Sequence, residues 1–402
     1  MTTLPAPLLS ATLDRHDLET AERWLADPQL GNDTRLTGDW ESRFARWLGG
    51  GTARAFMGGR AALLAVVRAL GLGQGDEVIV PAFSCQCVAN AIRFAGASVR
   101  YADIETDSFG LDLEATRAAL GPATRAILLQ HTFGLPSRDT AGLLQLAHER
   151  GLWVIEDCAH ALGARWQGRL LGTLGDAAVF SFERSKIITC IHGGMAVVHD
   201  PYAADQLARL AERAPLPDDD SLRGQLASVV HDYWVRAAPE RRPAAEVLPG
   251  LPAAVLPQMW PEEFEGVWLE RYGQRMPSSL ADLAGQQFAR LPEILARRRA
   301  QAAYWRDWAL ARGWQVADPQ PDSEPVWLRF PVLPPDDALK QSPEALAALA
   351  AELGVEIGVW FTTAAHPVAV DLPDCPVGLS AARRCLNLPT LLPAGHPHAA
   401  GS

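Results

Sequence analysis

The chain has 402 residues, of which 48% are hydrophobic and 21% are charged, a composition typical of a globular protein. Its formal net charge of -11 argues against nucleic acid or an anionic membrane surface as a partner. No apolar run reaches the roughly 18 residues that a membrane-spanning helix needs, and residues 1–20 lack the basic leader of a signal peptide. We therefore expect a cytoplasmic protein of two packed domains.

The six cysteines show neither a disulfide framework nor a zinc spacing. They are Cys85, Cys87, Cys158, Cys190, Cys375 and Cys385. One residue separates Cys85 from Cys87, whereas the usual metal knuckle has two, and no His pair follows. We expect reduced thiols and no metal site.

Only two of the 36 Lys and Arg residues are lysine, Lys186 and Lys340. Such a bias towards arginine suggests that a retained lysine is needed for the chemistry of its amine. A guanidinium cannot replace it, because it stays protonated and is not nucleophilic. Lys340 lies in the polar stretch DDALKQSPEAL and is expected on the solvated surface. Lys186 lies between an apolar strand pattern and a Gly-Gly pair, which makes it the candidate for forming an imine.

Between residues 58 and 200 the chain alternates helix and strand patterns. The expected strands are 77–83, 98–104, 125–131, 152–158, 176–182 and 193–200. The expected helices are 60–72, 88–96, 113–121 and 140–151. This alternation predicts an α/β fold with a mostly parallel sheet, in which ligands bind at the carboxyl ends of the strands.

The second half of the chain is less regular. Pro and acidic clusters interrupt short helical pieces over residues 201–265. A long helix is expected at 278–313 with a kink at Pro292, and the tail from 395 to 402 is expected to be disordered. Strand patterns at 325–333 and 355–360 flank a helix pattern at 342–354.

These patterns suggest a division of the chain into three parts. They are an N-terminal segment (1–50), a large ligand-binding domain (51–275) with 201–265 as an irregular insertion, and a smaller α+β domain (276–402).

Several polar residues follow strands in the way that a pyridoxal phosphate (PLP) site requires. Asp157 ends a strand and could keep a pyridine nitrogen protonated, although Asp in such a place also caps helices. His160 could reach the 3′-oxygen of the ring, although a lone His is more often just a satisfied polar group. Lys186 would supply the amine.

The phosphate of PLP also has candidate partners. Gly58, Gly59 and Arg60 open the helix expected at 60–72, so backbone amides and the helix N-terminus can bind an anion. Ser181, five residues before Lys186, could donate its hydroxyl to the same phosphate.

The run from Met57 to Asp200 resembles the DegT/DnrJ/StrS family of sugar aminotransferases. The resemblance is carried by GDEVIVPAFSCQCVANAIRFAGASVRYADIETDSFGLD, HTFGLP, VIEDCAHALGA, GTLGDAAVFSFERSK and HGGMAVV, and it continues more weakly towards the C-terminus. It implies a fold type I, aspartate aminotransferase-like enzyme of sugar biosynthesis. It also implies a homodimer with active sites at the interface, an amino-acid donor (glutamate) and a nucleotide-linked ketosugar as keto acceptor.

The resemblance also assigns roles to residues. Lys186 is the Schiff-base lysine, Asp157 is the partner of the pyridine nitrogen, and His160 takes the position that contacts the 3′-oxygen. The phosphate positions are taken by Gly59, Arg60 and Ser181.

Three positions depart from the family pattern. Arg60 stands where the phosphate loop usually has Thr, and Cys85 stands where an aromatic ring commonly covers PLP. The family segment Tyr-Asn-(Tyr/Ser)-Arg, whose Asn reaches the phosphate in the partner subunit, reads Tyr272-Gly273-Gln274-Arg275 here. We expect Arg60 to replace that lost contact with a charge-assisted one inside its own chain.

Other functions stay open because Cys85 and Gly273 border the expected substrate pocket. The main alternative is an aminotransferase, or another PLP enzyme, that acts on a non-sugar keto, aldehyde or amino-acid substrate. A PLP-dependent sugar dehydratase is a further one, but relatives of that type have His in place of Lys186. A regulator that keeps only the fold is disfavoured by the complete set of Lys, Asp, Ser and His.

Overall fold

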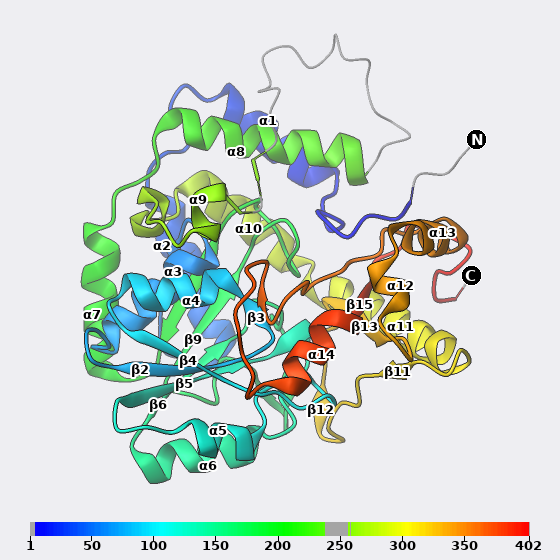
Figure 1. The fold of residues 1–402 in the computed structure, drawn as a ribbon. Coiled ribbons are helices and arrows are strands. Elements are labelled where there is room, and N and C mark those ends of the chain that lie inside the picture. The colour runs from blue at the N-terminus through cyan, green and yellow to red at the C-terminus, as the bar shows by residue number, and fades with distance from the viewer. Residues whose placement is uncertain (1–4, 238–255, 258, 402) are drawn as a thin grey trace.

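The computed structural model describes residues 5–237, 256–257 and 259–401, and its centre is a seven-stranded sheet (Figure 1). The strand order is β1-β10-β9-β6-β5-β2-β4. The strands are β1 (Thr52–Phe56), β2 (Glu77–Pro81), β4 (Ser98–Ala102), β5 (Thr124–Gln130), β6 (Trp153–Asp157), β9 (Ala177–Ser181) and β10 (Gly194–Val198). Strand β10 runs against both of its neighbours and the other pairs are parallel, so the predicted mostly parallel sheet is confirmed.

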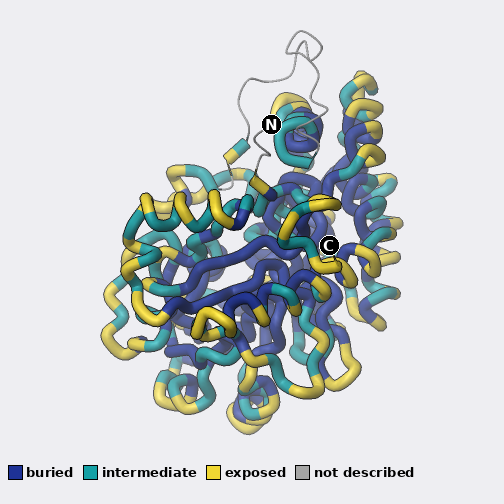
Figure 2. The backbone as a smooth tube through the Cα atoms, turned by 90° about the vertical axis from the view of Figure 1, so that its right-hand side faces the viewer, coloured by how far each residue is buried: buried dark blue, intermediate teal, exposed yellow. Residues whose placement is uncertain are grey.

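Helices cover both faces of this sheet (Figure 1). One face carries α3 (Gly59–Ala69), α4 (Gln86–Phe94) and α7 (Pro201–Arg213). The other carries α5 (Leu113–Ala119) and α6 (Thr140–Arg150). Figure 2 shows the strands as the buried layer between them, and every residue of β2, β9 and β10 is buried. Burial on both faces explains why these strands are continuous apolar runs in the sequence.

A helical layer packs beside the sheet. It comprises α1 (Arg15–Ala26), α2 (Arg35–Leu48), α8 (Asp219–Asp232), α10 (Ser278–Ala289) and α11 (Leu291–Leu310). The single helix predicted at 278–313 is broken at Arg290, and Pro292 lies in the first turn of α11, where its missing N–H costs no hydrogen bond.

The segment 201–265 is more regular than its sequence suggests. Asp200 and Asp218 cap α7 and α8, which run for 13 and 14 residues and bury apolar faces. Residues 238–255 and 258 lie outside the described residues, and α9 (Pro261–Phe264) follows them. The prediction of only short, interrupted helices was wrong over 201–232, because the caps and the buried faces outweigh the flanking Pro and acidic clusters.

The C-terminal part forms a second, smaller sheet with helices against it. Its strands are β11 (Gln315–Val316), β13 (Arg329–Leu333) and β15 (Leu386–Pro389), and its helices are α12 (Ala338–Gln341), α13 (Pro343–Leu353) and α14 (Pro376–Arg384). A third small sheet contains β7 (Arg165–Trp166), β8 (Arg169–Leu170) and β12 (Ser323–Glu324). The division into domains at residues 50 and 275 stays a prediction.

Two sequence predictions for this part were wrong. The strand expected at 355–360 forms only single bridges, at Val355 and Gly358, and the pairing of Gly358 with Asn387 stops after that one pair. The tail is not disordered over 395–401: Tyr304 contacts the His398 ring at 2.6 Å, and Gln301 donates to its carbonyl oxygen at 2.8 Å. Within the described residues, no helix is both long and apolar enough to cross a membrane.

Lys340 is not a solvated surface residue, as its sequence context suggested. Its Nζ donates to the carbonyl oxygens of Phe361, Ala382 and Cys385 at 2.9, 2.8 and 2.8 Å. Burial lowers the pKa of this amine to about 8. The side chain therefore ties α12 to the end of α14 and to the segment at Phe361.

We expect Lys340→Met to lower the free energy of unfolding by about 1–3 kcal/mol, because the three carbonyl oxygens lose their donor. Thermal unfolding monitored by circular dichroism measures the change. Arg383→Met is the matched control, since Arg383 lies on α14 but its side chain is 56% exposed. Equal stability of the two variants would contradict the structural role of Lys340.

Candidate functional site

A cavity of about 470 Å³ lies at the carboxyl ends of the parallel strands. It is lined by all the site residues predicted from the sequence: Gly58, Gly59, Arg60, Cys85, Asp157, His160, Ser181 and Lys186. The structure thus brings together residues from the start of α3, from the ends of β6 and β9, and from the connections that follow these strands. Their roles stay predictions.

Lys186 lies in the connection between β9 and β10, where its backbone N–H donates to the carbonyl oxygen of Glu183 at 2.9 Å. Its Nζ is 5.5 Å from the ring centroid of Trp360. Burial lowers the pKa of the amine, and the negative charges around it, with Glu183 the largest, oppose this shift. The environment therefore favours the neutral, nucleophilic form more than water does.

Asp157 ends β6 with its carboxylate buried at the cavity. Its Oδ1 accepts from the N–H of Ala159 at 2.9 Å. Burial raises the pKa of this carboxyl, and the hydrogen bond and the charge of Lys186 oppose the rise. A protonated ring nitrogen next to it would stabilise the carboxylate further, so the environment suits a cationic partner.

The His160 ring has a defined tautomer. Its Nδ1 accepts from the N–H of Phe133 at 3.2 Å. Burial and the charges of Lys186 and Arg329 lower the pKa of the ring well below its usual value, so the imidazole is neutral. The remaining proton is therefore on Nε2, which makes His160 a donor to an oxygen atom.

The phosphate end of the cavity is built from close backbone contacts. A Cβ atom on Gly59 would lie 2.9 Å from Cβ of Ser181, and one on Gly194 would lie 2.5 Å from the carbonyl carbon of Gly58. Neither position has room for a side chain, so the first amides of α3 lie next to the Ser181 hydroxyl. This cradle fits the phosphate of PLP, since a helix N-terminus attracts an anion.

Arg60 makes a contact that the sequence did not suggest. Its guanidinium forms an ion pair with Glu263 in α9 at 3.1 Å. Glu263 is fully buried, and it also accepts from the Tyr272 hydroxyl at 2.5 Å and from the Trp260 N–H at 2.7 Å. The charge of Arg60 is thus balanced by an acid of its own chain, which weakens the expectation that it alone compensates for the lost contact across the interface.

No aromatic side chain stands at position 85. Cys85 ends β3 (Ser84–Cys85), which pairs in parallel with β14 (Ala365–His366), so that Cys85 lies opposite His366. This pairing brings His366, Trp360 and Phe361 from the C-terminal part to the cavity. Sequence reasoning missed these three residues, because a two-residue pairing leaves no periodic pattern.

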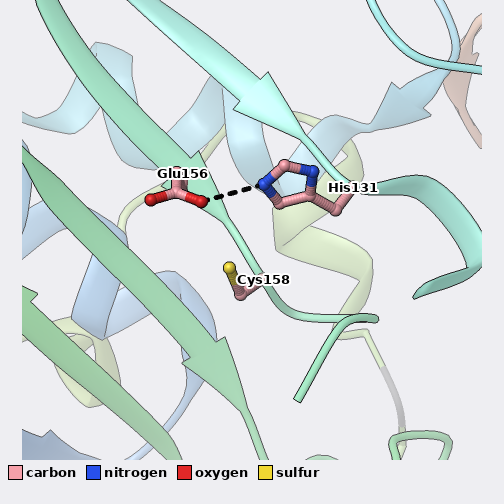
Figure 3. A group of neighbouring side chains, drawn as sticks. All are labelled: His131, Glu156 and Cys158. Carbon is pink, nitrogen blue, oxygen red and sulfur yellow. Dashed lines mark hydrogen bonds and ion pairs between the residues drawn. The ribbon is translucent and has the colours of Figure 1, made fainter. Parts of the chain in front are cut away.

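Figure 3 shows a buried group of three side chains, His131, Glu156 and Cys158, of which His131 lines the cavity. Nε2 of His131 lies 3.1 Å from Glu156, whose two oxygens also accept from the N–H groups of residues 172, 174 and 175. Burial raises the pKa of the Cys158 thiol well above its usual value. These hydrogen bonds account for the buried carboxylate without a metal ion.

Comparison with known proteins decides the family. The sequence pattern of the DegT/DnrJ/EryC1/StrS aminotransferase family matches residues 12–226 and 258–394. The chain belongs to this family. Its members are PLP-dependent aminotransferases of fold type I, so the chain is an aminotransferase and the predicted fold class is confirmed.

Solved structures of the DegT family agree with this assignment. DesV of S. venezuelae is 25% identical with a TM-score of 0.73, over 99% of this chain and 96% of its own. DesI is also 25% identical with a TM-score of 0.67, over 97% and 89% of the two chains. The synthase of 3-amino-5-hydroxybenzoic acid is 23% identical with a TM-score of 0.71, over 95% and 93%, and shows the same fold.

Cys87 differs from the other thiols of this DegT-family member in its acidity. A hydrogen bond with Cys85, followed by the charges of Arg60 and Lys186, lowers its pKa to about 7 against the effect of burial. Burial raises the pKa of Cys190 and Cys385, and the hydrogen bond and burial raise that of Cys85.

Because the thiolate is the reactive form, we expect the cofactor-free protein to contain one cysteine whose alkylation by iodoacetamide has its midpoint near pH 7. Its rate should rise only about ten-fold from pH 6 to pH 8, whereas the rate of a thiol with its usual pKa rises about a hundred-fold. Mass spectrometry of the labelled peptides identifies it as Cys87. The Cys87→Ser variant should lose the fast phase. A wild-type profile with its midpoint near pH 9 would contradict the lowered pKa.

Proposed function

We propose that this chain binds PLP through Lys186 and transfers an amino group from glutamate to a nucleotide-linked ketosugar. The observation that carries the proposal is the meeting of the Lys186 amine, the Asp157 carboxylate and the Gly59–Ser181 cradle in one cavity. DesI, which is 25% identical, was solved in the presence of its TDP-sugar product, which supports the choice of acceptor.

Bound PLP would supply an electron sink for the negative charge that develops at the Cα atom of the amino donor. Asp157 would hold a proton on the pyridine nitrogen, and Nε2 of His160 would donate to the 3′-oxygen. The Lys186 amine, with its lowered pKa, would remove the proton from Cα and return it as general base and acid. The cradle at Gly59 and Ser181 would hold the phosphate while Lys186 moves.

We further propose a cytoplasmic homodimer. Three large apolar side chains near the cavity remain exposed in the single chain: Phe264 by 41%, Val267 by 45% and Trp268 by 42%. Exposed apolar groups of this size often belong to protein interfaces. Phe264 also lines the cavity, so a partner that covers it would help to close the site.

A non-sugar acceptor is the second candidate. The cavity walls carry Met259, Phe264, Trp360 and Phe361, and apolar walls suit an aromatic or aliphatic substrate. The fold itself is compatible with such chemistry, since 3-amino-5-hydroxybenzoic acid synthase shares it.

The two lysines provide a matched test of the cofactor. Purified protein supplied with PLP should absorb visible light, and borohydride reduction should attach the cofactor to the Lys186 peptide. Lys186→Arg should lose the colour and lower the amino-transfer rate by at least about 10²–10⁴-fold, because a guanidinium neither forms the link nor exchanges the proton. Lys340→Arg should keep both the visible colour and the amino-transfer rate. A colourless wild-type protein that takes up no PLP would refute the proposal.

The acceptor is tested with protein loaded with pyridoxamine phosphate. Mixing it with a panel of keto-sugar nucleotides, simple keto acids and aldehydes should restore the visible colour with the sugar nucleotides, because only a true acceptor regenerates PLP. Return of the colour with keto acids or aldehydes alone would exclude the sugar and support the second candidate.

A further inference from the structure

Arg271 lies at the cavity on the 3-10 helix η5 (Glu270–Gly273), with its Cζ 3.5 Å from the ring centroid of Trp260. Within the described part of the chain, its guanidinium forms no ion pair with any carboxylate. Burial and the nearby charge of Arg60 lower its pKa to about 10. A half-buried cation thus faces the cavity and is repelled by a neighbouring cation.

Glu263 attracts this charge but forms no ion pair with it. One of its oxygens is shared by Arg60 and the Tyr272 hydroxyl, and the other accepts from the backbone N–H of Trp260. The Arg271 guanidinium therefore still has N–H groups that can donate. Because it is planar and presents several donors, it suits an anion with several oxygens.

His192 provides an independent observation that points to a ligand. It lines the same cavity, only 3% of the residue is exposed, and its ring centroid lies 5.2 Å from that of Trp260. The His192 ring interacts with the backbone of Pro257, whereas its Nε2 is buried and has no hydrogen-bond partner among the residues that the structure describes. A buried polar atom without a partner is costly, so a ligand that binds it would relieve that cost.

The place of this pair in the fold suggests which ligand. His192 stands two residues before Gly194, the glycine that packs on the Gly58–Gly59 peptide at the mouth of the cradle. The charges of Arg271 and Arg60 both act on His192. The Arg271 guanidinium and the Nε2 atom of His192 therefore lie beside the phosphate cradle, at the same end of the cavity.

We propose that Arg271, packed against Trp260 beside His192, forms a phosphoryl-binding site within a single chain. The inference rests on the proposed function and refines it: with Arg60 balanced by Glu263, Arg271 supplies a charge-assisted contact in place of the Asn contact that the departure at Gly273 removes. The phosphoryl group comes from the 5′-phosphate of PLP or from a phosphate of the acceptor, and contiguity with the cradle favours the former.

The site itself is tested with inorganic phosphate on the cofactor-free protein. Phosphate should raise the melting temperature of the wild type by mass action, and Arg271→Met should lose most of this shift. Arg312→Met is the matched control, because Arg312 also lies over a tryptophan, with its Cζ 4.0 Å from the Trp308 ring, but does not line the cavity. An equal shift in wild type and Arg271→Met would overturn the proposal, whether or not PLP binds.

The source of the phosphoryl group is tested by titrating PLP and pyridoxal, which lacks the phosphate, and following the visible absorbance. If the site holds the cofactor, Arg271→Met should weaken PLP binding by about 10–100-fold and leave pyridoxal binding unchanged. Arg271→Lys keeps the charge but not the planar guanidinium group, so its affinity for PLP should lie between those of the wild type and Arg271→Met.

If the site holds a phosphate of the acceptor instead, PLP affinity should stay the same, while the KM of phosphate-bearing acceptors rises and that of phosphate-free acceptors does not. If Arg271→Met changes neither the affinity for PLP nor the KM of phosphate-bearing acceptors, the role of Arg271 is refuted, while the proposed function is not affected. Failure of the wild type to bind PLP at all would refute the proposed function, and the phosphate shift would still test the site.

Discussion

The close approach of three backbone segments is the constraint on which the site depends. Gly59 enters α3 directly against Ser181 of β9, and Gly194 of β10 packs on the Gly58–Gly59 peptide, so neither Gly59 nor Gly194 has room for a Cβ atom. The strand order places β9 between β10 and β6, so the same contact that forms the cradle also sets its position relative to Asp157. The Gly59–Ser181 cradle and the Asp157 carboxylate thus lie at the edge of one sheet. Lys186, in contrast, lies on the connection between β9 and β10.

A second set of contacts completes the cavity from elsewhere in the chain. The pairing of β3 with β14 brings the C-terminal wall to Cys85, and α9 brings Glu263 to Arg60. Lys340 then holds the carbonyl oxygen of Phe361 and so supports the wall from behind. The cavity is therefore formed by segments that are distant in the sequence and meet only in the folded chain.

The sheet and the polar residues at its carboxyl edge were predictable because each has a local cause. Buried parallel strands are continuous apolar runs bounded by turns, and the polar residue that ends such a run, as Asp157 ends β6, must lie at the ligand edge. The proposed role of Arg271 and the cavity position of His192 were not predictable, because they depend on contacts in the folded chain rather than on a sequence pattern. The environment of Lys340 escaped prediction for a similar reason: its polar neighbours in sequence are not its neighbours in space.

The scarcity of lysine has a chemical consequence beyond catalysis. An aldehyde reacts with unprotonated amines wherever it meets them, and the side chains of this protein offer two. One of these, on Lys340, is occupied by three carbonyl oxygens, so the amine at the cavity competes mainly with the chain terminus. The arginine side chains do not form imines, so the amine at the cavity has few competitors among the side chains of its own chain.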